Sequence, residues 1–372
     1  MALEQNSASA ERDTVTRRTL LASALAAAAL PSAARAEDAP PATASAASGL
    51  NSRRIPARDL PVPKTVSREL QAVIGAPYPL GWDDIPQDAT AWKDLAFKSA
   101  ASVANDIAAI GKHFDLQIEK TAMAGVPVFV ITPPEIAPAN RDRLLLHIHG
   151  GGFVLFPGEA GAGEGMMMAG YGKFRVVSID YRMAPDFPFP AALEDVTAVW
   201  RVLLASYEPS RMAIFGTSAG GALTLSTILR AKAEGLPLPA AIAPGSPCAD
   251  LTWAGDTVEA NAYVDNSLVA HTGWVGAAAT LYAGTHDLTN PELSPIFGDF
   301  TGFPPAILTS GTRDLLLSDT VRVHRKLRQA HVDARLQVFE GESHAQFLTP
   351  FVPETTEAFG EIAHFFDANL SS

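Results

Sequence analysis

The stretch AIFGTSAGGALTLSTILRAKAEG, residues 213–235, decides the fold and places one reactive side chain. Its first residues are apolar and its last part has helical spacing, so the glycines between them mark a turn from strand to helix. At that turn the pattern G-x-S-x-G surrounds Ser218, which is typical of a serine nucleophile held on a strained turn. Gly216 and Gly220 are needed there because larger side chains would collide. The alternative is a Gly-Ser turn that only caps a helix.

A serine hydroxyl is a poor nucleophile at neutral pH and needs a base, usually histidine, that a carboxylate orients. Downstream of Ser218, Asp314 and His344 each follow a short apolar run by a few residues. We therefore predict Ser218, Asp314 and His344 as the catalytic residues. Asp319 is the rival acid, but its place in a helical stretch favours capping or pairing there. Three further histidines lack a strand-end position and are expected at the surface: His324, His331 and His364.

The stretch HIHGGGF, residues 147–153, raises the question of why three side chains are given up in a row. Glycines directly behind a strand let main-chain N–H groups approach an oxyanion closely, and HGGG is typical of such a loop. The predicted oxyanion-hole donors are the N–H groups of Gly151, Gly152 and Ala219. Gly150 and His149 are expected to support the loop, His149 by hydrogen bonding rather than by proton transfer.

Short apolar runs separated by helical or loop segments indicate buried parallel strands. These runs lie at 144–148, 175–179, 212–215, 240–243, 305–310 and 335–339. Before them, residues 115–134 hold two short runs about a glycine, which predicts an antiparallel pair. Helical spacing is clearest at 89–110. No repeat of fixed period is present, so the sequence predicts an α/β fold with a mostly parallel eight-stranded sheet flanked by helices.

Composition excludes several classes of protein. The 372 residues include 40 Asp or Glu and 28 Lys or Arg, a formal charge of −12, and this acidic excess argues against binding to nucleic acid. A single cysteine, Cys248, rules out an internal disulfide or a cysteine zinc cluster. Because no P-loop, dinucleotide or metalloprotease motif is present, no cofactor and no metal are predicted.

The first 36 residues are typical of an export signal. Paired Arg17 and Arg18 precede an apolar stretch at 20–30, and the Ala-x-Ala pattern at 34–36 suits cleavage. That stretch is too short to span a bilayer, so removal is expected rather than a stable membrane anchor. The paired arginines resemble a bacterial twin-arginine signal, with an ordinary secretory signal as the alternative. A periplasmic or secreted protein is predicted, with residues 37–52 as a disordered linker.

Five segments together resemble the bacterial hormone-sensitive-lipase-like esterases of the α/β-hydrolase superfamily: HGGGF, DYRMAPDFPFPAALEDV, FGTSAGG, SGTRDLLLSD and GESHAQF. Thr217 stands where many members have Asp, which places the chain with the G-T-S-A-G variant. The resemblance implies an α/β-hydrolase fold with a helical cap. Residues 53–110 would form an N-terminal helical cap segment and 111–372 the catalytic domain, with a cap insert near 250–293. Three tryptophans belong to the cap and would line a pocket or pack the cap: Trp82, Trp253 and Trp274.

The leading hypothesis is a serine carboxylesterase that hydrolyses short-chain carboxylic esters through an acyl-enzyme. One alternative is a lactone or acetyl-ester hydrolase with the same triad. Another is a non-catalytic small-molecule-binding protein on this fold, as in the plant gibberellin receptors, which resemble the family but have lost the catalytic His. Retention of all three predicted catalytic residues favours hydrolysis. The expected partner is a small-molecule ester substrate, and the oligomeric state is left open.

Overall fold

The computed structural model describes residues 52–371, and the chain from Arg58 onward forms one compact unit within that range. The predicted export signal at 1–36 and nearly all of the predicted linker at 37–52 therefore lie outside the described residues. Within the described range, no helix combines the length and the apolar character that crossing a membrane requires.

One eight-stranded sheet forms the centre of this unit, with the order β1-β2-β4-β3-β5-β6-β7-β8. The first two strands run antiparallel to their neighbours, and β4, β3, β5, β6, β7 and β8 are parallel, which confirms the predicted mostly parallel sheet. The strands are β1 (Gln117–Met123), β2 (Val126–Thr132), β3 (Leu144–Ile148), β4 (Arg175–Ile179), β5 (Met212–Thr217), β6 (Ala241–Gly245), β7 (Ala306–Gly311) and β8 (Ala334–Phe339).

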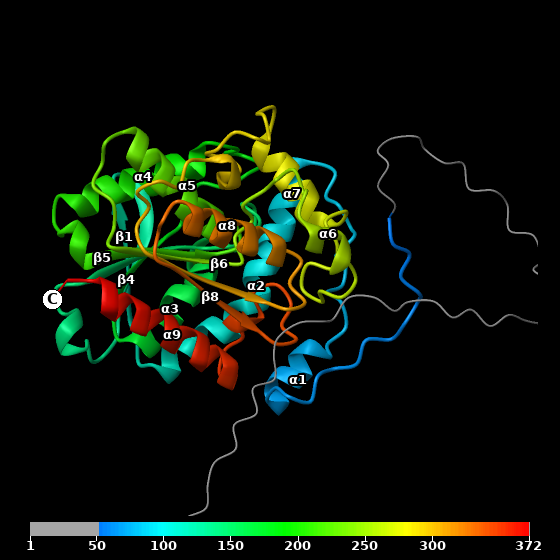
Figure 1. Ribbon diagram of the computed structural model, residues 1–372. Coiled ribbons are helices and arrows are strands. Elements are labelled where there is room, and N and C mark those ends of the chain that lie inside the picture. Colours follow the sequence, from blue (N-terminus) through cyan, green and yellow to red (C-terminus); the bar gives the residue numbers. More distant parts are fainter. Residues whose placement is uncertain (1–51, 372) are drawn as a thin grey trace, which may run out of the picture. The chain divides into compact units, whose positions relative to one another are not determined.

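Helices cover both faces of the sheet, with α4, α5 and α8 on one face and α3 and α9 on the other (Figure 1). The helices are α1 (Arg68–Ile74), α2 (Ala89–His113), α3 (Gly163–Gly172), α4 (Ala191–Leu204), α5 (Ala219–Ala233), α6 (Asp256–Ala260), α7 (Trp274–Ala283), α8 (Leu317–Gln329) and α9 (Pro353–Asn369). Short 3₁₀ turns are η1 (Pro138–Asn140), η2 (Gly158–Ala162), η3 (Pro209–Arg211), η4 (Pro295–Phe297) and η5 (Gln346–Leu348). The second helix extends past residue 110, the predicted end of its segment.

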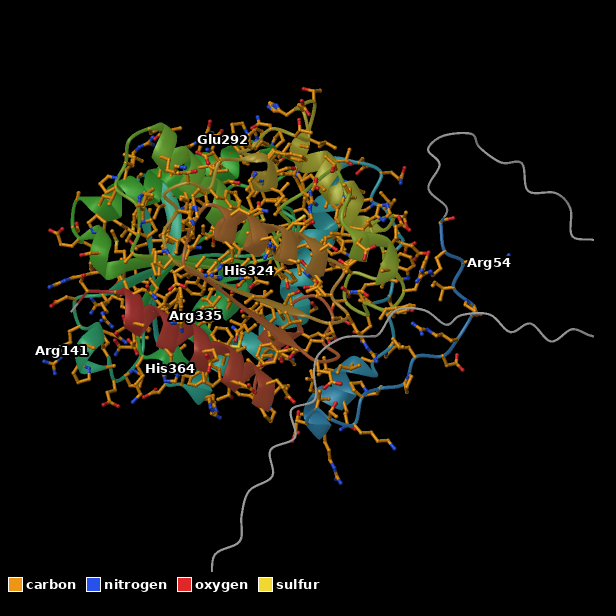
Figure 2. All side chains as sticks on the ribbon, viewed as in Figure 1. Arg54, Arg141, Glu292, His324, Arg335 and His364 are labelled. Carbon is orange, nitrogen blue, oxygen red and sulfur yellow. The ribbon has the colours of Figure 1, made fainter. Side chains whose placement is uncertain are left out.

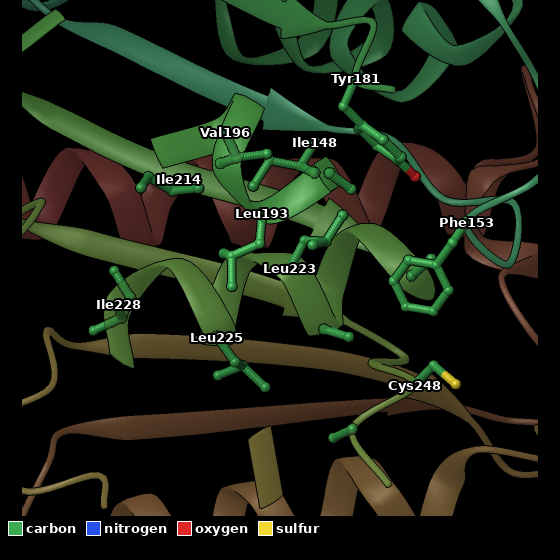
Figure 3. Close-up of a cluster of buried hydrophobic side chains, with 14 of the residues drawn as sticks. Ile148, Phe153, Tyr181, Leu193, Val196, Ile214, Leu223, Leu225, Ile228 and Cys248 are labelled. Atoms are coloured by element: carbon green, nitrogen blue, oxygen red, sulfur yellow. The ribbon is translucent and has the colours of Figure 1, made fainter. Parts of the chain in front are cut away.

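Two layers of apolar side chains hold the helices to the sheet. Ile148, Leu193 and Leu225 belong to the layer between the sheet and the face of α4, α5 and α8 (Figure 3). Met166 and Phe359 belong to the layer on the opposite face, under α3 and α9. Because both faces are covered, the inner strands are buried along their length and appear in the sequence as continuous apolar runs rather than alternating ones.

Strand β5 continues two residues beyond the apolar run that predicted it. The run ends at Phe215, but Gly216 pairs with Pro244 and Thr217 with Gly245 on β6. Hydrogen bonding to the neighbouring strand, not side-chain hydrophobicity, thus extends β5 directly to Ser218. The loops after β5, β7 and β8 leave the same edge of the sheet, because parallel strands all end there.

Candidate active site

Ser218 occupies a backbone conformation that non-glycine residues rarely adopt. It lies between β5 and α5 with φ 63° and ψ −120°, outside the regions that suit a residue with a Cβ atom. Three backbone hydrogen bonds fix it: its N–H donates to Gly245 O at 2.9 Å, and its carbonyl accepts from the N–H groups of Ala222 and Cys248. The strain is therefore held by the surrounding main chain, as expected where a side chain must be presented at a site.

Gly216 and Gly220 allow the turn that carries Ser218, which we call the elbow, to pack against β3. A Cβ atom added at Gly216 would lie 2.0 Å from the carbonyl oxygen of Ile148, and one added at Gly220 would lie 1.9 Å from the same oxygen. Both distances are far below van der Waals contact. The collision that the sequence predicts thus occurs, and the partner is the backbone of the neighbouring strand.

Gly220→Ala is expected to destabilise the protein by roughly 4 kcal/mol or more, because neither the elbow nor β3 can move away from the added methyl group. The matched control is Gly360→Ala on α9, where an added Cβ meets nothing within 4 Å. That change should raise the free energy of unfolding by about 0.5–1 kcal/mol. Chemical denaturation of both variants checks the pair. A Gly220→Ala protein as stable as the wild type would contradict the packing argument.

Asp314 and His344 form a buried hydrogen-bonded pair. The Nδ1 atom of His344 lies 3.0 Å from Oδ1 of Asp314, whose side chain is fully buried. The second carboxylate oxygen, Oδ2, accepts hydrogen bonds from the hydroxyls of Ser246 and Ser310. Burial acts to raise the pKa of Asp314, but the charge of His344 and these hydrogen bonds outweigh burial and lower it. Asp314 is therefore an ionised acceptor at neutral pH.

His344, the hydrogen-bond partner of Asp314, lines the same cavity as Ser218. Burial acts to lower the pKa of His344, but the charge and the hydrogen bond of Asp314 outweigh burial and raise it. Within the described residues no hydrogen bond joins the His344 ring to the Ser218 hydroxyl. Such contacts are often long in unliganded enzymes and shorten when substrate binds. Ser218 and His344 thus line one cavity, and Asp314 is buried as the hydrogen-bond partner of His344.

The glycine loop behind β3 has the conformation that close approach to a ligand requires. Gly151 and Gly152 have φ values of 105° and 60°, and a Cβ atom at Gly151 would lie 2.7 Å from Leu155 O. In the described part of the chain, neither of their N–H groups donates a backbone hydrogen bond. Ala219 is the first residue of α5, where an N–H group has no partner within the helix. Three unpaired backbone donors are thus available for an anion.

His149 holds the first peptide of this loop. Its Nδ1 atom lies 2.7 Å from Gly150 O, and its ring stacks on Tyr181 with centroids 4.1 Å apart. Burial lowers the pKa of His149 to about 4, so the ring is neutral at pH 7. Since a carbonyl oxygen only accepts, Nδ1 must carry the proton. The hydroxyl of Tyr181 also donates to His149 O, at 3.0 Å. The supporting role of His149 stays a prediction, and these contacts are the hydrogen bond and the packing that such a role requires.

Glu164, at the start of α3, is a carboxylate at this site that sequence reasoning missed. Its Oε1 atom accepts a hydrogen bond from Thr217 Oγ1 at 2.8 Å, directly before Ser218. Its Oε2 atom lies 3.2 Å from Nε2 of the buried His147, whose Nδ1 lies 2.8 Å from Ser178 Oγ. A chain of polar groups therefore runs from the interior of the sheet to the elbow. No local motif marks Glu164, because its partners are distant in sequence.

The cavity over Ser218 has a volume of about 370 Å³ and mostly apolar walls. Side chains of α2 form one wall, among them Val103, Ile107 and Ile110, and the segment 267–275 forms another. Of the three candidate tryptophans, Trp274 lines the cavity. Trp82 instead packs edge-on against Tyr78 and Tyr263, and Trp253 lies beside His271. Trp274 therefore lines the cavity, whereas Trp82 and Trp253 lie outside its lining and pack against other aromatic rings.

The rival residues lie elsewhere. Asp319, in the first turn of α8, accepts hydrogen bonds from the N–H groups of Ala249 and Asp250 and lies 3.6 Å from Arg322. His324 and His364 lie on α8 and α9, outside the cavity lining (Figure 2). His331 is exposed. Among residues 52–371, no group of three or more His, Cys, Asp or Glu side chains is arranged to hold a metal ion.

Comparison with known proteins adds to this geometry. A family model described as alpha/beta hydrolase fold matches residues 145–348, which include the glycine loop, Ser218, Asp314 and His344. An esterase of Acinetobacter venetianus is 30% identical over 256 residues, covering 67% of this chain and 82% of the relative.

Solved structures agree with the sequence comparison. The crystal structure of esterase E25 aligns with a TM-score of 0.83 and 39% identity, covering 86% of this chain and 99% of the other. An esterase from the bacterial hormone-sensitive lipase family aligns with a TM-score of 0.68 and 31% identity, covering 82% and 99% of the two chains.

Proposed function

Because the chain belongs to the α/β-hydrolase family, as a carboxylic ester hydrolase similar to the bacterial hormone-sensitive lipases, we propose that Ser218, His344 and Asp314 are its nucleophile, base and orienting acid. The observation that carries this assignment is the 3.0 Å hydrogen bond of a buried Asp314 to a histidine that shares a cavity with Ser218. The relatives are esterases, so hydrolysis is favoured over non-catalytic binding.

In this mechanism the Ser218 hydroxyl attacks the ester carbonyl while Nε2 of His344 takes its proton. Asp314 holds the proton of His344 on Nδ1, which leaves Nε2 free as the base, and it stabilises the imidazolium that forms. The imidazolium then gives its proton to the departing alcohol. Water, activated by the same histidine, hydrolyses the acyl-enzyme and restores Ser218.

The N–H groups of Gly151, Gly152 and Ala219 would stabilise the oxyanion that forms in both steps. Their backbone positions are fixed before substrate binds, so little reorganisation is needed when negative charge develops. Ala219 N–H also lies at the positive end of the α5 dipole, which favours the same charge. His149, Gly150, Gly216 and Gly220 serve this arrangement as supports of the loop and the elbow.

We propose that residues 53–110 and the insert near 250–293 act as a cap over the catalytic domain, 111–372, and restrict the enzyme to short acyl chains. The support is the lining of the cavity by α2 and by Trp274, and a volume near the lower end of the roughly 300–1,000 Å³ of ligand pockets. We also place the chain with the G-T-S-A-G variant of the family, on Thr217. The second candidate, acetyl-ester or lactone hydrolysis, uses the same triad.

The test is a series of p-nitrophenyl esters from acetate to palmitate, with kcat/KM measured for each. We expect activity concentrated at the short chains, because long acyl groups exceed the walled volume. Activity that rises toward palmitate would contradict the proposed cap. A set of lactones and acetylated sugars, measured in parallel, separates the second candidate: a kcat/KM for one of these far above that of the best simple ester would favour it.

We further propose that residues 1–36 direct export to the periplasm or the medium through the twin-arginine route, with 37–52 as a linker. The support is the sequence pattern alone: Arg17 and Arg18, the apolar stretch at 20–30, and the Ala-x-Ala site. N-terminal sequencing of the exported protein should begin near Glu37. Normal export after Arg17→Lys and Arg18→Lys together would contradict the twin-arginine assignment and leave an ordinary secretory signal.

A further inference from the structure

Asp265 is a buried carboxylate that no motif of the sequence includes. It lies between α6 and α7, within the insert near 250–293, and its side chain has no exposed surface. A buried carboxylate is costly unless it is hydrogen-bonded, so its partners indicate what it does. Every partner of this carboxylate is a backbone N–H group, and the four partners come from three different loops.

The two oxygens of Asp265 face in different directions. Oδ1 accepts from the N–H groups of Ser267 at 2.7 Å and Leu268 at 3.0 Å, on its own segment. Oδ2 accepts from the N–H groups of Leu315 at 2.8 Å and His344 at 3.1 Å. Leu315 directly follows Asp314. One carboxylate oxygen therefore ties the main chain beside the proposed acid to the main chain of the proposed base.

Neighbouring residues of the insert reinforce this tie. Asn261 donates a hydrogen bond to Asp314 O at 2.8 Å. Asn266 accepts at Oδ1 from Ser343 Oγ at 2.8 Å and from Gln346 Nε2 at 2.7 Å, on both sides of His344. The insert thus contacts each catalytic loop through hydrogen bonds on buried or half-buried groups. These bonds fix where the two loops lie relative to each other.

We propose that Asp265 is a positioning residue for ester hydrolysis. It holds Asp314 and His344 at fixed positions relative to each other and joins them to the segment of the insert that lines the cavity. Ser267 and Leu268, held by its Oδ1, line the cavity, so one side chain connects the cavity wall to the catalytic pair. This inference rests on the roles proposed above for Asp314 and His344. Small displacements of such groups reduce rates strongly, because proton transfer depends on reach and alignment.

The charge of Asp265 also acts on the base. Asp314, from the loop after β7, and Asp265, from the insert, are the negative groups that raise the pKa of His344, against the effect of its burial. Burial and the charge of Asp314 raise the pKa of Asp265 itself. On the histidine's own loop, burial raises the pKa of Glu342 to about 8, so Glu342 is mainly neutral at pH 7. Removal of Asp265 should therefore lower the pKa of His344.

The experiment uses Asp265→Ser in the mature protein. A serine hydroxyl can still accept from the N–H groups of residues 267 and 268, as in a serine turn, but it is too short to reach Leu315 and His344 as well. We expect kcat to fall by about 10- to 100-fold with KM changed less than threefold. When kcat/KM is measured against pH, the acidic limb of the profile should move to lower pH. A purely structural role would not produce this shift.

A second variant, Asp265→Asn, keeps the shape but puts an NH₂ group against N–H donors on one side. Its kcat should fall by a factor similar to that of Asp265→Ser. The matched control is Asp319→Asn, another buried carboxylate, which accepts its two backbone N–H bonds from Ala249 and Asp250 rather than from the main chain of Leu315 or His344. Its kcat should stay within twofold of the wild type. Thermal unfolding and a fluorophosphonate labelling rate are recorded for every protein.

The outcomes separate this inference from the proposed triad. Failure of the wild type to be labelled at Ser218 would contradict the triad itself. With rapid labelling of the wild type, an unchanged kcat and an unchanged acidic limb in Asp265→Ser would overturn the role of Asp265 alone. Equal losses in Asp319→Asn, or unfolding of both Asp265 variants at 25 °C, would also overturn it, because Asp265 would then serve the fold rather than the catalytic pair.

Discussion

Ser218→Ala is expected to lower kcat for p-nitrophenyl butyrate by about 10⁴- to 10⁶-fold and to leave KM and the melting temperature nearly unchanged. The change removes the atom that forms the acyl-enzyme, while the elbow is held by its main chain through Gly245, Ala222 and Cys248. The residual rate should come from the oxyanion donors and substrate binding. Steady-state kinetics and covalent labelling by a fluorophosphonate, read by mass spectrometry, check both parts.

The matched control is Ser226→Ala, which removes a hydroxyl from α5, the helix that follows Ser218. Ser226 is buried but lies outside the lining of the cavity, so its variant should keep both activity and labelling. Labelling that persists in Ser218→Ala would assign the nucleophile to another residue. A similar loss of activity in Ser226→Ala would show that any disturbance of α5 abolishes the reaction, and the identification of Ser218 would then lose its support.

Much of this site could be predicted from the sequence because its signals are local. G-x-S-x-G needs glycine at both ends for a steric reason that the structure shows in the contacts of Gly216 and Gly220 with Ile148 O. Asp314 and His344 could be placed because each follows an apolar run, and parallel strands all end at one edge of the sheet. These inferences required only strand positions and chain order.

Residues that act through distant partners could not be predicted in this way. Asp265 accepts a hydrogen bond from the N–H group of His344, 79 positions away, and Glu164 accepts one from Thr217, 53 positions away. Neither pair follows a helical or strand period, so only the folded chain brings them together. Glu340 and Glu342 likewise look equivalent in the sequence, yet Glu340 is exposed whereas Glu342 is buried without a hydrogen-bond partner on either oxygen.

The same limit applies to the proposed cap segments. The family resemblance placed three tryptophans there, but whether an aromatic ring lines a cavity depends on the direction of its side chain. Trp274 is directed by the start of α7 toward Gly152, where an added Cβ would lie 3.0 Å from its ring. Trp82 is held by aromatic neighbours away from the cavity lining. Such directions follow from packing between segments distant in sequence.

Asp314→Asn is expected to lower kcat by about 10⁴-fold and also to reduce stability. All the hydrogen-bond partners of this carboxylate donate: His344 and Leu316 N–H at Oδ1, and the hydroxyls of Ser246 and Ser310 at Oδ2. An asparagine must turn its NH₂ group toward one of these pairs. Hydroxyls can rotate to accept, so the amide nitrogen should take the Oδ2 side, and the carbonyl should still accept from Nδ1 of His344.

Even in that favourable orientation the charge is lost, so the imidazolium formed during the reaction is no longer stabilised and the pKa of His344 falls. We therefore expect a fall in kcat with little change in KM, an acidic limb shifted to lower pH, and a loss of about 1–3 kcal/mol in the free energy of unfolding from the disturbed buried hydrogen bonds. Asp319→Asn serves again as the control for removal of a buried carboxylate. A kcat within tenfold of the wild type in Asp314→Asn would contradict the role of Asp314 as the carboxylate that orients the base.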